Sequence, residues 1–244
     1  MRALSSADVL ETWERGSALV PAGRMLELLR LASPGEAPDA LAELPLGECN
    51  RRLLAVHGAA FGPRLEAVTA CPGCGERLEL ELPAAALAAA GADGAPAEVR
   101  VEAEGHQVAC RPLVAADLVA AAAYADVASA RGALVRRCVR AATRGGDGVP
   151  AEALPEVVVE AVGRALLESD PGAELLLELV CPACEKRWEA PLEPAEFVWA
   201  ELRAGAERLL WEVHSLARAY GWTEPQVLAL SAPRRRAYLE LAGA

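Results

Sequence analysis

Four of the seven cysteines stand in two Cys-Pro-x-Cys pairs, at positions 71 and 74 and at positions 181 and 184. Structural zinc sites take four ligands in a tetrahedron, often thiolates. One Cys-x-x-Cys turn places two sulfurs on one side of an ion, so two turns complete the site. The spacing therefore predicts one structural metal ion, zinc or iron by spacing alone. We assign it as zinc, and its expected ligands are Cys71, Cys74, Cys181 and Cys184.

The two pairs lie far apart in the chain, with residues 75–180 between them. The entropy lost on closing a loop grows only logarithmically with loop length, so this closure costs about a few kcal/mol. Zinc binding contributes on the order of 10 kcal/mol. We therefore expect the metal ion to tie together two segments that are distant in sequence.

Two other interpretations of the pairs stay open: a dithiol redox site and unliganded buried thiols. In redox proteins the first cysteine begins a helix, which lowers its pKa. Here Leu78, Leu80 and Leu82 alternate with charged residues after the first pair, which predicts a strand. The other cysteines stand alone and are expected to be small buried residues: Cys49, Cys110 and Cys138.

The sequence around the first pair is repeated weakly around the second. Residues 65–83 and 175–194 share the order strand, cysteine turn, strand, helix, which predicts two matching hairpins. Gly75 follows the first pair, as such turns prefer, whereas Glu185 follows the second. A third hairpin is expected over 99–110, turning at Glu104 and Gly105.

Helical patterns fill most of the remaining chain. We expect helices within 7–61, two more between 113 and 142, one over 153–168, a loop at 144–150, and a long helix from Pro194 to Gly221. The predicted class is α+β, mainly helical, with two or three antiparallel hairpins, two of which form a split zinc ribbon. The predicted segments, forming one compact unit, are 1–62, 63–112, 113–170 (a helical insert), 171–192 and 193–244.

Composition restricts the partners. The net charge is −11 and the pI about 4.9, so the overall field repels nucleic acid. The basic clusters are small and are expected to be solvated helix faces: Arg136, Arg137 and Arg140, and Arg234, Arg235 and Arg236.

Several function classes lack their sequence signals. The first residues carry acids where a signal peptide needs an apolar stretch, and no apolar run is long enough for a bilayer. Phosphate-binding loops, nucleophile elbows and zinc-protease motifs are missing too. We therefore expect a non-enzymatic protein in the cytoplasm of the producing cell, with no membrane, nucleic-acid or small-molecule partner.

The C-terminal run 214–242 resembles the C-terminus of baseplate hub assembly proteins from contractile-tailed phages. The matching features are an aromatic-Gly-Trp corner, an acidic short helix, paired arginines and Tyr-Leu. The rest is similar to a longer variant from phage-like contractile injection systems, matched here by Phe61-Gly62, by both cysteine pairs and by Trp199. In the C-terminal run, four residues are candidate partner contacts: Trp222, Arg234, Arg235 and Tyr238.

This resemblance implies a non-enzymatic assembly factor or structural component of a baseplate, bound to hub, spike or tube proteins. Such a protein either stays in the cytoplasm or enters the phage tail-like particle. One alternative is a zinc-ribbon protein acting on nucleic acid, with Arg234–Arg236 on a helix at the DNA. The other is the dithiol redox protein.

Overall fold

The computed structural model describes residues 4–89 and 94–243 and has the α+β class predicted from the sequence, with small antiparallel sheets. The helices are α1 (Ser6–Ser17), α2 (Pro21–Ala32), α3 (Pro38–Ala42), α4 (Leu46–Ala60), α5 (Ala84–Ala89), α6 (Ala115–Ala121), α7 (Val127–Cys138), α8 (Glu156–Ser169), α9 (Pro194–Tyr220), α10 (Glu224–Leu228) and α11 (Ala232–Ala242). The strands are β1 (Arg64–Ala70), β2 (Arg77–Pro83), β3 (Val99–Ala103), β4 (His106–Cys110), β5 (Val139–Arg144), β6 (Asp147–Gly148), β7 (Leu175–Val180) and β8 (Arg187–Leu192).

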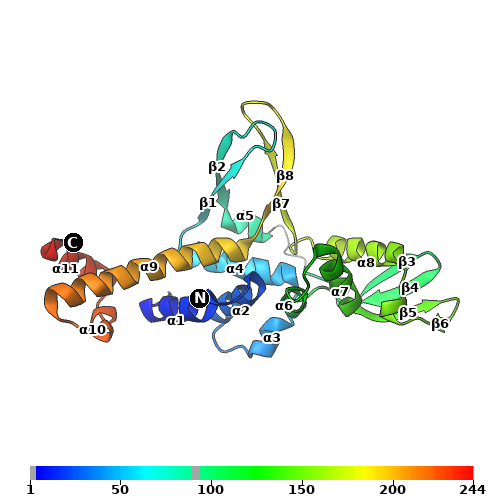
Figure 1. The fold of residues 1–244 in the computed structure, drawn as a ribbon, viewed down its shortest axis with the longest axis horizontal. Coiled ribbons are helices and arrows are strands. Elements are labelled where there is room, and N and C mark those ends of the chain that lie inside the picture. Colours follow the sequence, from blue (N-terminus) through cyan, green and yellow to red (C-terminus); the bar gives the residue numbers. More distant parts are fainter. Residues whose placement is uncertain (1–3, 90–93, 244) are drawn as a thin grey trace.

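Helices α1, α2, α4 and α9 form an elongated helical body (Figure 1). Its core includes Leu28, Leu53 and Leu202, all fully buried. The predicted long helix is α9, which has Pro194 in its first turn and ends at Gly221, where φ is 71°. Because only glycine adopts this left-handed conformation without a steric penalty, Gly221 fixes the point where the helix stops. Within the described residues, no helix is both long enough and apolar enough to cross a bilayer.

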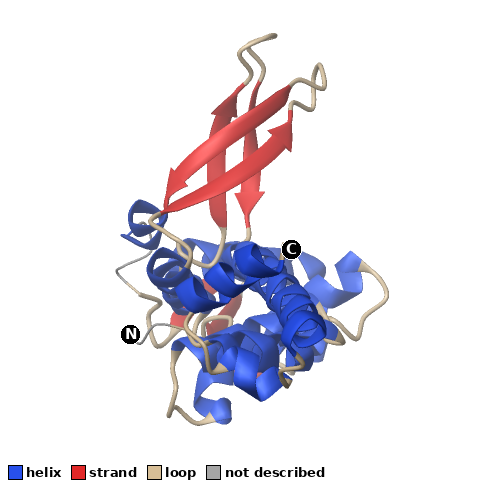
Figure 2. Ribbon diagram, turned by 90° about the vertical axis from the view of Figure 1, so that its left-hand side faces the viewer, coloured by secondary structure: helices blue, strands red, loops and turns tan. Residues whose placement is uncertain are grey.

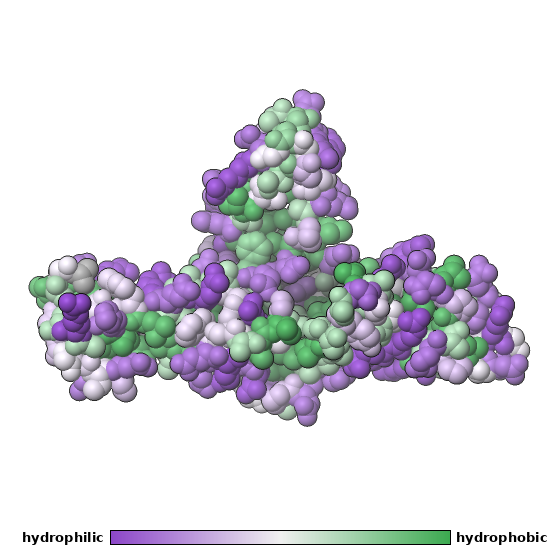
Figure 3. Space-filling model, in the orientation of Figure 1, coloured by the Kyte–Doolittle hydropathy of each residue, from purple (hydrophilic) through white to green (hydrophobic). Residues whose placement is uncertain are grey.

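Two antiparallel hairpins, β1–β2 and β7–β8, rise side by side from the helical body (Figures 1 and 2). We call this pair the tower. Side chains alternate along every strand, so one face of each hairpin turns toward the other hairpin and the second face meets solvent. At the foot, Leu65, Leu175 and Leu192 are buried together with Leu54 of α4. Figure 3 shows hydrophobic residues at this foot and hydrophilic ones along the flanks.

Strands β3 to β6 form a four-stranded sheet in sequential order, and α8 packs against β3 and β4. We call this sheet, with α7 and α8, the β3–β6 unit. The predicted hairpin over 99–110 is confirmed. Its turn residues Glu104 and Gly105 have φ values of 48° and 73°. Positive φ at both positions is the geometry that lets a two-residue turn follow the twist of its strands.

The prediction of helix up to residue 142 is wrong at its end. Helix α7 stops at Cys138, and residues 139–144 form β5, which pairs with β4. The predicted loop at 144–150 contains the short strand β6 after a turn at Gly145 and Gly146. Pairing with β4 satisfies the backbone groups of β5, and this tertiary contact outweighs the helix propensity of its alanines.

Two buried carboxylates, Asp117 and Asp170, lie where the helical body meets the β3–β6 unit. Asp117, at the start of α6, accepts hydrogen bonds from Nη1 and Nη2 of Arg111 at 2.6 and 2.8 Å and from Arg137 Nε at 3.0 Å. Burial alone would raise the pKa of Asp117, but the two arginines and the Val114 amide outweigh it and hold this pKa below its usual range. Asp170 caps α4 by accepting from the Gly47 amide at 2.9 Å.

Candidate metal centre

The two cysteine turns at the top of the tower share one backbone design. In the first, the Cys71 amide donates to the Glu76 carbonyl at 2.8 Å, and the Gly75 amide donates to the Cys71 carbonyl at 2.9 Å. In the second, the equivalent distances from Cys181 to Lys186 and from Glu185 to Cys181 are 2.9 and 3.0 Å. These hydrogen bonds hold the cysteines of each pair on one side of their turn.

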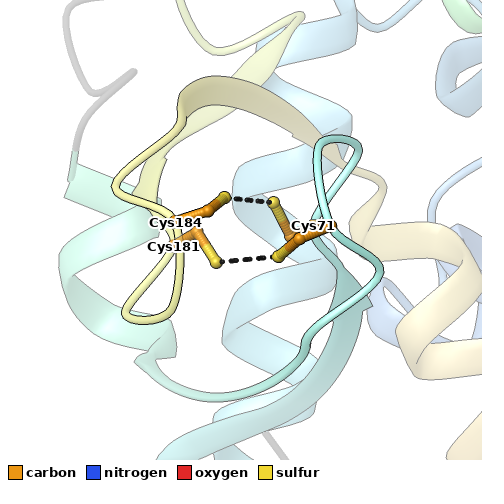
Figure 4. Close-up of side chains that lie close together, drawn as sticks. Cys71, Cys181 and Cys184 are labelled. Atoms are coloured by element: carbon orange, nitrogen blue, oxygen red, sulfur yellow. Dashed lines mark hydrogen bonds between the residues drawn. The ribbon is translucent and has the colours of Figure 1, made fainter.

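The four predicted ligands meet between the two turns, and their Sγ atoms all lie within 4.8 Å of one another. The Sγ atoms of Cys71 and Cys184 are 3.6 Å apart, as are those of Cys74 and Cys181 (Figure 4). A tetrahedral ion with sulfur ligands at about 2.3 Å places those sulfurs about 3.8 Å from each other. The arrangement therefore has the size of a four-thiolate site and could hold a metal ion.

The electrostatics of the cluster also favour a cation. Burial would raise the pKa of Cys71, but the amides of Gly73 and Cys74 and the neighbouring thiols outweigh it and lower the pKa to about 6. The Glu76 amide lowers the pKa of Cys74, yet the other three thiols raise it to about 12. One thiolate forms readily and then disfavours the next, because like charges repel at this distance. A bound cation removes that repulsion.

Side chains of both hairpins pack against the two buried cysteines. Leu78 is buried with Cys71 and Cys181, and Leu80 and Trp188 pack against the same cluster. A Cβ on Gly73 would lie 2.7 Å from the Lys186 side chain of the opposite turn. The contributions of Gly73 and Trp188 were not predicted from the sequence, since each depends on contact between two hairpins that are distant in the chain.

Neither cysteine pair begins a helix, because each is followed by a strand, as the sequence predicts. The sulfurs of opposite turns, at 3.6 Å, are also well beyond the S–S bond length of about 2.05 Å. The isolated cysteines lie elsewhere and are buried. Burial raises the pKa of Cys49 and Cys138 to about 12 and that of Cys110 to about 11, so these thiols stay protonated at neutral pH.

The four C-terminal candidate residues differ in their burial and in their contacts. Trp222 and Tyr238 are half-buried and meet edge to face with ring centroids 4.8 Å apart, over Leu216 and Leu239. Arg235 is buried and donates to Glu212 at 2.6 Å and to the Leu230 carbonyl at 2.7 Å. Its side chain is therefore bonded within the chain, and its predicted partner contact stays a prediction. Arg234 is exposed.

Comparison of the chain with models of known protein families, with curated proteins and with solved structures finds no match.

Proposed function

We propose that this protein is a non-enzymatic assembly factor or structural component of the baseplate of a contractile phage tail or phage-like injection system, stabilised by a structural zinc ion. The observation that carries the structural role is the closed set of four converging thiols. Catalytic zinc sites keep one position open for water or substrate, whereas four protein thiolates fill the tetrahedron. An ion held in this way ties elements together and does not bind a substrate.

Zinc suits this role better than iron. It has no redox chemistry and no geometric preference of its own, so it holds the two turns of the split ribbon without exposing the chain to electron transfer. The expected result is one zinc per chain in the purified protein, measured by elemental analysis. Iron with a visible absorption band, or no metal at all, would contradict this part of the proposal.

The baseplate role is supported by the C-terminal resemblance. The residues that carry it form a compact end of the molecule, where α10 and α11 fold back on α9 around Tyr220, Trp222 and Tyr238. Exposed Arg234 beside this aromatic cluster has the chemistry of an interface anchor. Baseplate hub, spike and tube proteins are the partners that the resemblance implies.

The nucleic-acid alternative is opposed by the charge on the tower. A ribbon that meets nucleic acid needs a basic face. The outward positions of the strands instead carry more carboxylates than arginines. The arginines are Arg64, Arg77 and Arg187, and the exposed carboxylates are Glu66, Glu79, Glu81, Glu178 and Glu189.

Affinity purification of the tagged full-length chain from its native cells at low salt, followed by mass spectrometry, tests the baseplate role. We expect hub, spike or tube proteins to co-purify, and an Arg234→Glu change to reduce their recovery. A matched Arg203→Glu change on the exposed side of α9 serves as the control. Recovery of polymerase subunits or nucleic acid, without baseplate proteins, would overturn the proposal.

A further inference from the structure

An apolar groove of about 600 Å³ lies beneath the foot of the tower. Its walls come from eight elements: α2, α4, α6, α7, α8, β7, β8 and α9. Apolar side chains of this lining include Met25, Leu118, Leu134, Leu167 and Leu192. The body is hollowed below the tower foot in Figure 3. We call this hollow the basal groove. It continues between α7 and α8 into a second hollow of about 540 Å³, which shares Leu134 and Leu167.

The basal groove combines buried and partly exposed apolar side chains. Met25 and Leu192 are buried, Leu118 and Leu134 are half-buried, and Leu167 is 43% exposed. Contiguous exposed apolar surface of this kind marks binding sites on soluble proteins. Pockets for small ligands bury most of the ligand surface, whereas this groove is open to solvent and extends past α7. Its form suits a segment of a macromolecule.

The rim of the groove carries three carboxylates, from Glu174, Glu193 and Glu196. No described residue forms an ion pair with any of the three. Glu48 of α4, by contrast, pairs with both Arg51 and Arg52. A groove with an apolar floor and an unpaired acidic rim is complementary to an occupant that is apolar on one side and basic at its edges.

The form of the occupant follows from the groove wall. A bound peptide strand would need free main-chain donors along β8, but Pro191 and Pro194 remove the N–H groups where β8 and the start of α9 line the groove. Contacts must therefore come from side chains. An amphipathic helix satisfies this requirement, since it offers anchors at spacings of three and four residues to a groove built by other helices.

We propose that the basal groove binds an amphipathic helix of a partner protein, with leucine-sized side chains on one face and arginine or lysine residues flanking that face. This inference goes beyond the proposed function and does not depend on the metal, because none of the four cysteines lines the groove.

The test uses the full-length chain with a photo-reactive phenylalanine analogue at Leu167, illuminated in the cells that make the protein. The control places the same analogue at Val157, which is 51% exposed on the same helix but does not line the groove. We expect an adduct at residue 167 at least tenfold stronger than at residue 157. Mass spectrometry should locate it in an apolar and basic helical segment of another protein.

Charge reversal then tests the rim. Replacing both Glu174 and Glu193 by lysine should reduce the adduct about tenfold, whereas the same double change at Glu178 and Glu189 should leave it within about twofold. The control carboxylates face each other on the outer face of β7–β8 and carry the same total charge. No adduct at residue 167, an adduct with a second copy of this chain, or one on an acidic segment would each overturn the proposal.

Discussion

The tower and the β3–β6 unit are both small antiparallel structures attached to the helical body, but they differ in what lies between their layers. The β3–β6 unit packs its sheet on α8 and has a continuous core that includes Val108, Val158 and Val162, each at most 2% exposed. The tower has buried residues at its foot and around the cysteines, with half-buried leucines such as Leu177 and Leu179 between them.

A two-stranded hairpin is marginally stable in water by itself. The β3–β6 unit overcomes this limit with four strands and a helix packed over a shared core. The tower brings together two hairpins of two strands each, with only a thin apolar layer between them. We infer that its upper half depends on the proposed metal ion, whereas the β3–β6 unit does not.

The largest effect is expected when the proposed metal ion is removed. Chelation or a Cys181→Ser change should separate the tops of the two hairpins, because the ligation energy that joins them, on the order of 10 kcal/mol for zinc sites, is removed. Hydrogen exchange followed by mass spectrometry should show lost protection in β1, β2, β7 and β8, with protection in β3–β5 retained.

The matched control for this change is Cys110→Ser. Cys110 is also fully buried, but it lies in β4 and outside the cysteine cluster. We expect this variant to keep its full metal content and its protected tower. If chelation instead unfolded the whole chain at once, the two units would not be independent, and the comparison would fail.

The second test weakens the β3–β6 unit. An Asp117→Asn change leaves Arg111 and Arg137 without their charged partner and should reduce the free energy of unfolding by about 3 kcal/mol. Metal content should not change. Asp126→Asn is the control, since Asp126 is an exposed N-cap whose side chain accepts from the Ser129 amide at 2.8 Å, and asparagine caps about as well. Equal effects of the two changes on denaturant unfolding would contradict this role of Asp117.

The contacts of Asp117 with Arg111 and Arg137 also predict that the stability of the fold depends on pH. The pKa of Asp117 is lower in the folded chain than its ordinary value, so its stabilising contribution is complete above the pKa of the unfolded chain, about 3.9, and is lost as the pH falls through the folded value. The stability difference between the native chain and Asp117→Asn should therefore be constant above about pH 5 and shrink below about pH 4. A difference that grows on acidification would have the wrong sign.

The sequence predicts a unit when a local pattern of residues specifies it, and it fails when contacts between distant segments do. The tower was foreseen, because the cysteine spacing and the alternation of Leu78, Leu80 and Leu82 are local patterns that stay visible in one sequence. Strand β5 was missed, because Ala141 and Ala142 favour helix locally and become a strand only by pairing with β4. Local patterns cannot report a partner that is distant in the chain.

The same limit applied to single residues. Arg235 looked like one of three equivalent exposed arginines, and only its contacts with Glu212 and the Leu230 carbonyl distinguish it. The basal groove was not predicted either, since eight separate elements contribute its walls. The cysteine cluster is the exception among these long-range features, because a tetrahedral structural metal site requires four ligands and the sequence offers two matched pairs.

The smallest test compares the two turns of the tower. Gly75 and Glu185 occupy equivalent positions with φ values of 77° and 58°, in the left-handed region that disfavours every residue with a Cβ atom. A Cβ on Gly75 would meet no atom within 4 Å, so a Gly75→Ala change adds backbone strain without a clash.

We therefore expect Gly75→Ala to weaken the site by about 1 kcal/mol and Glu185→Gly to strengthen it by about the same amount. Competition with a chelator measures both, as opposite shifts of about fivefold in apparent zinc affinity. Glu185→Ala, which removes the carboxylate and keeps the Cβ, separates the backbone effect from the charge. If Ala and Gly at position 185 strengthened binding equally, the charge of Glu185 and not its backbone strain would distinguish the two turns.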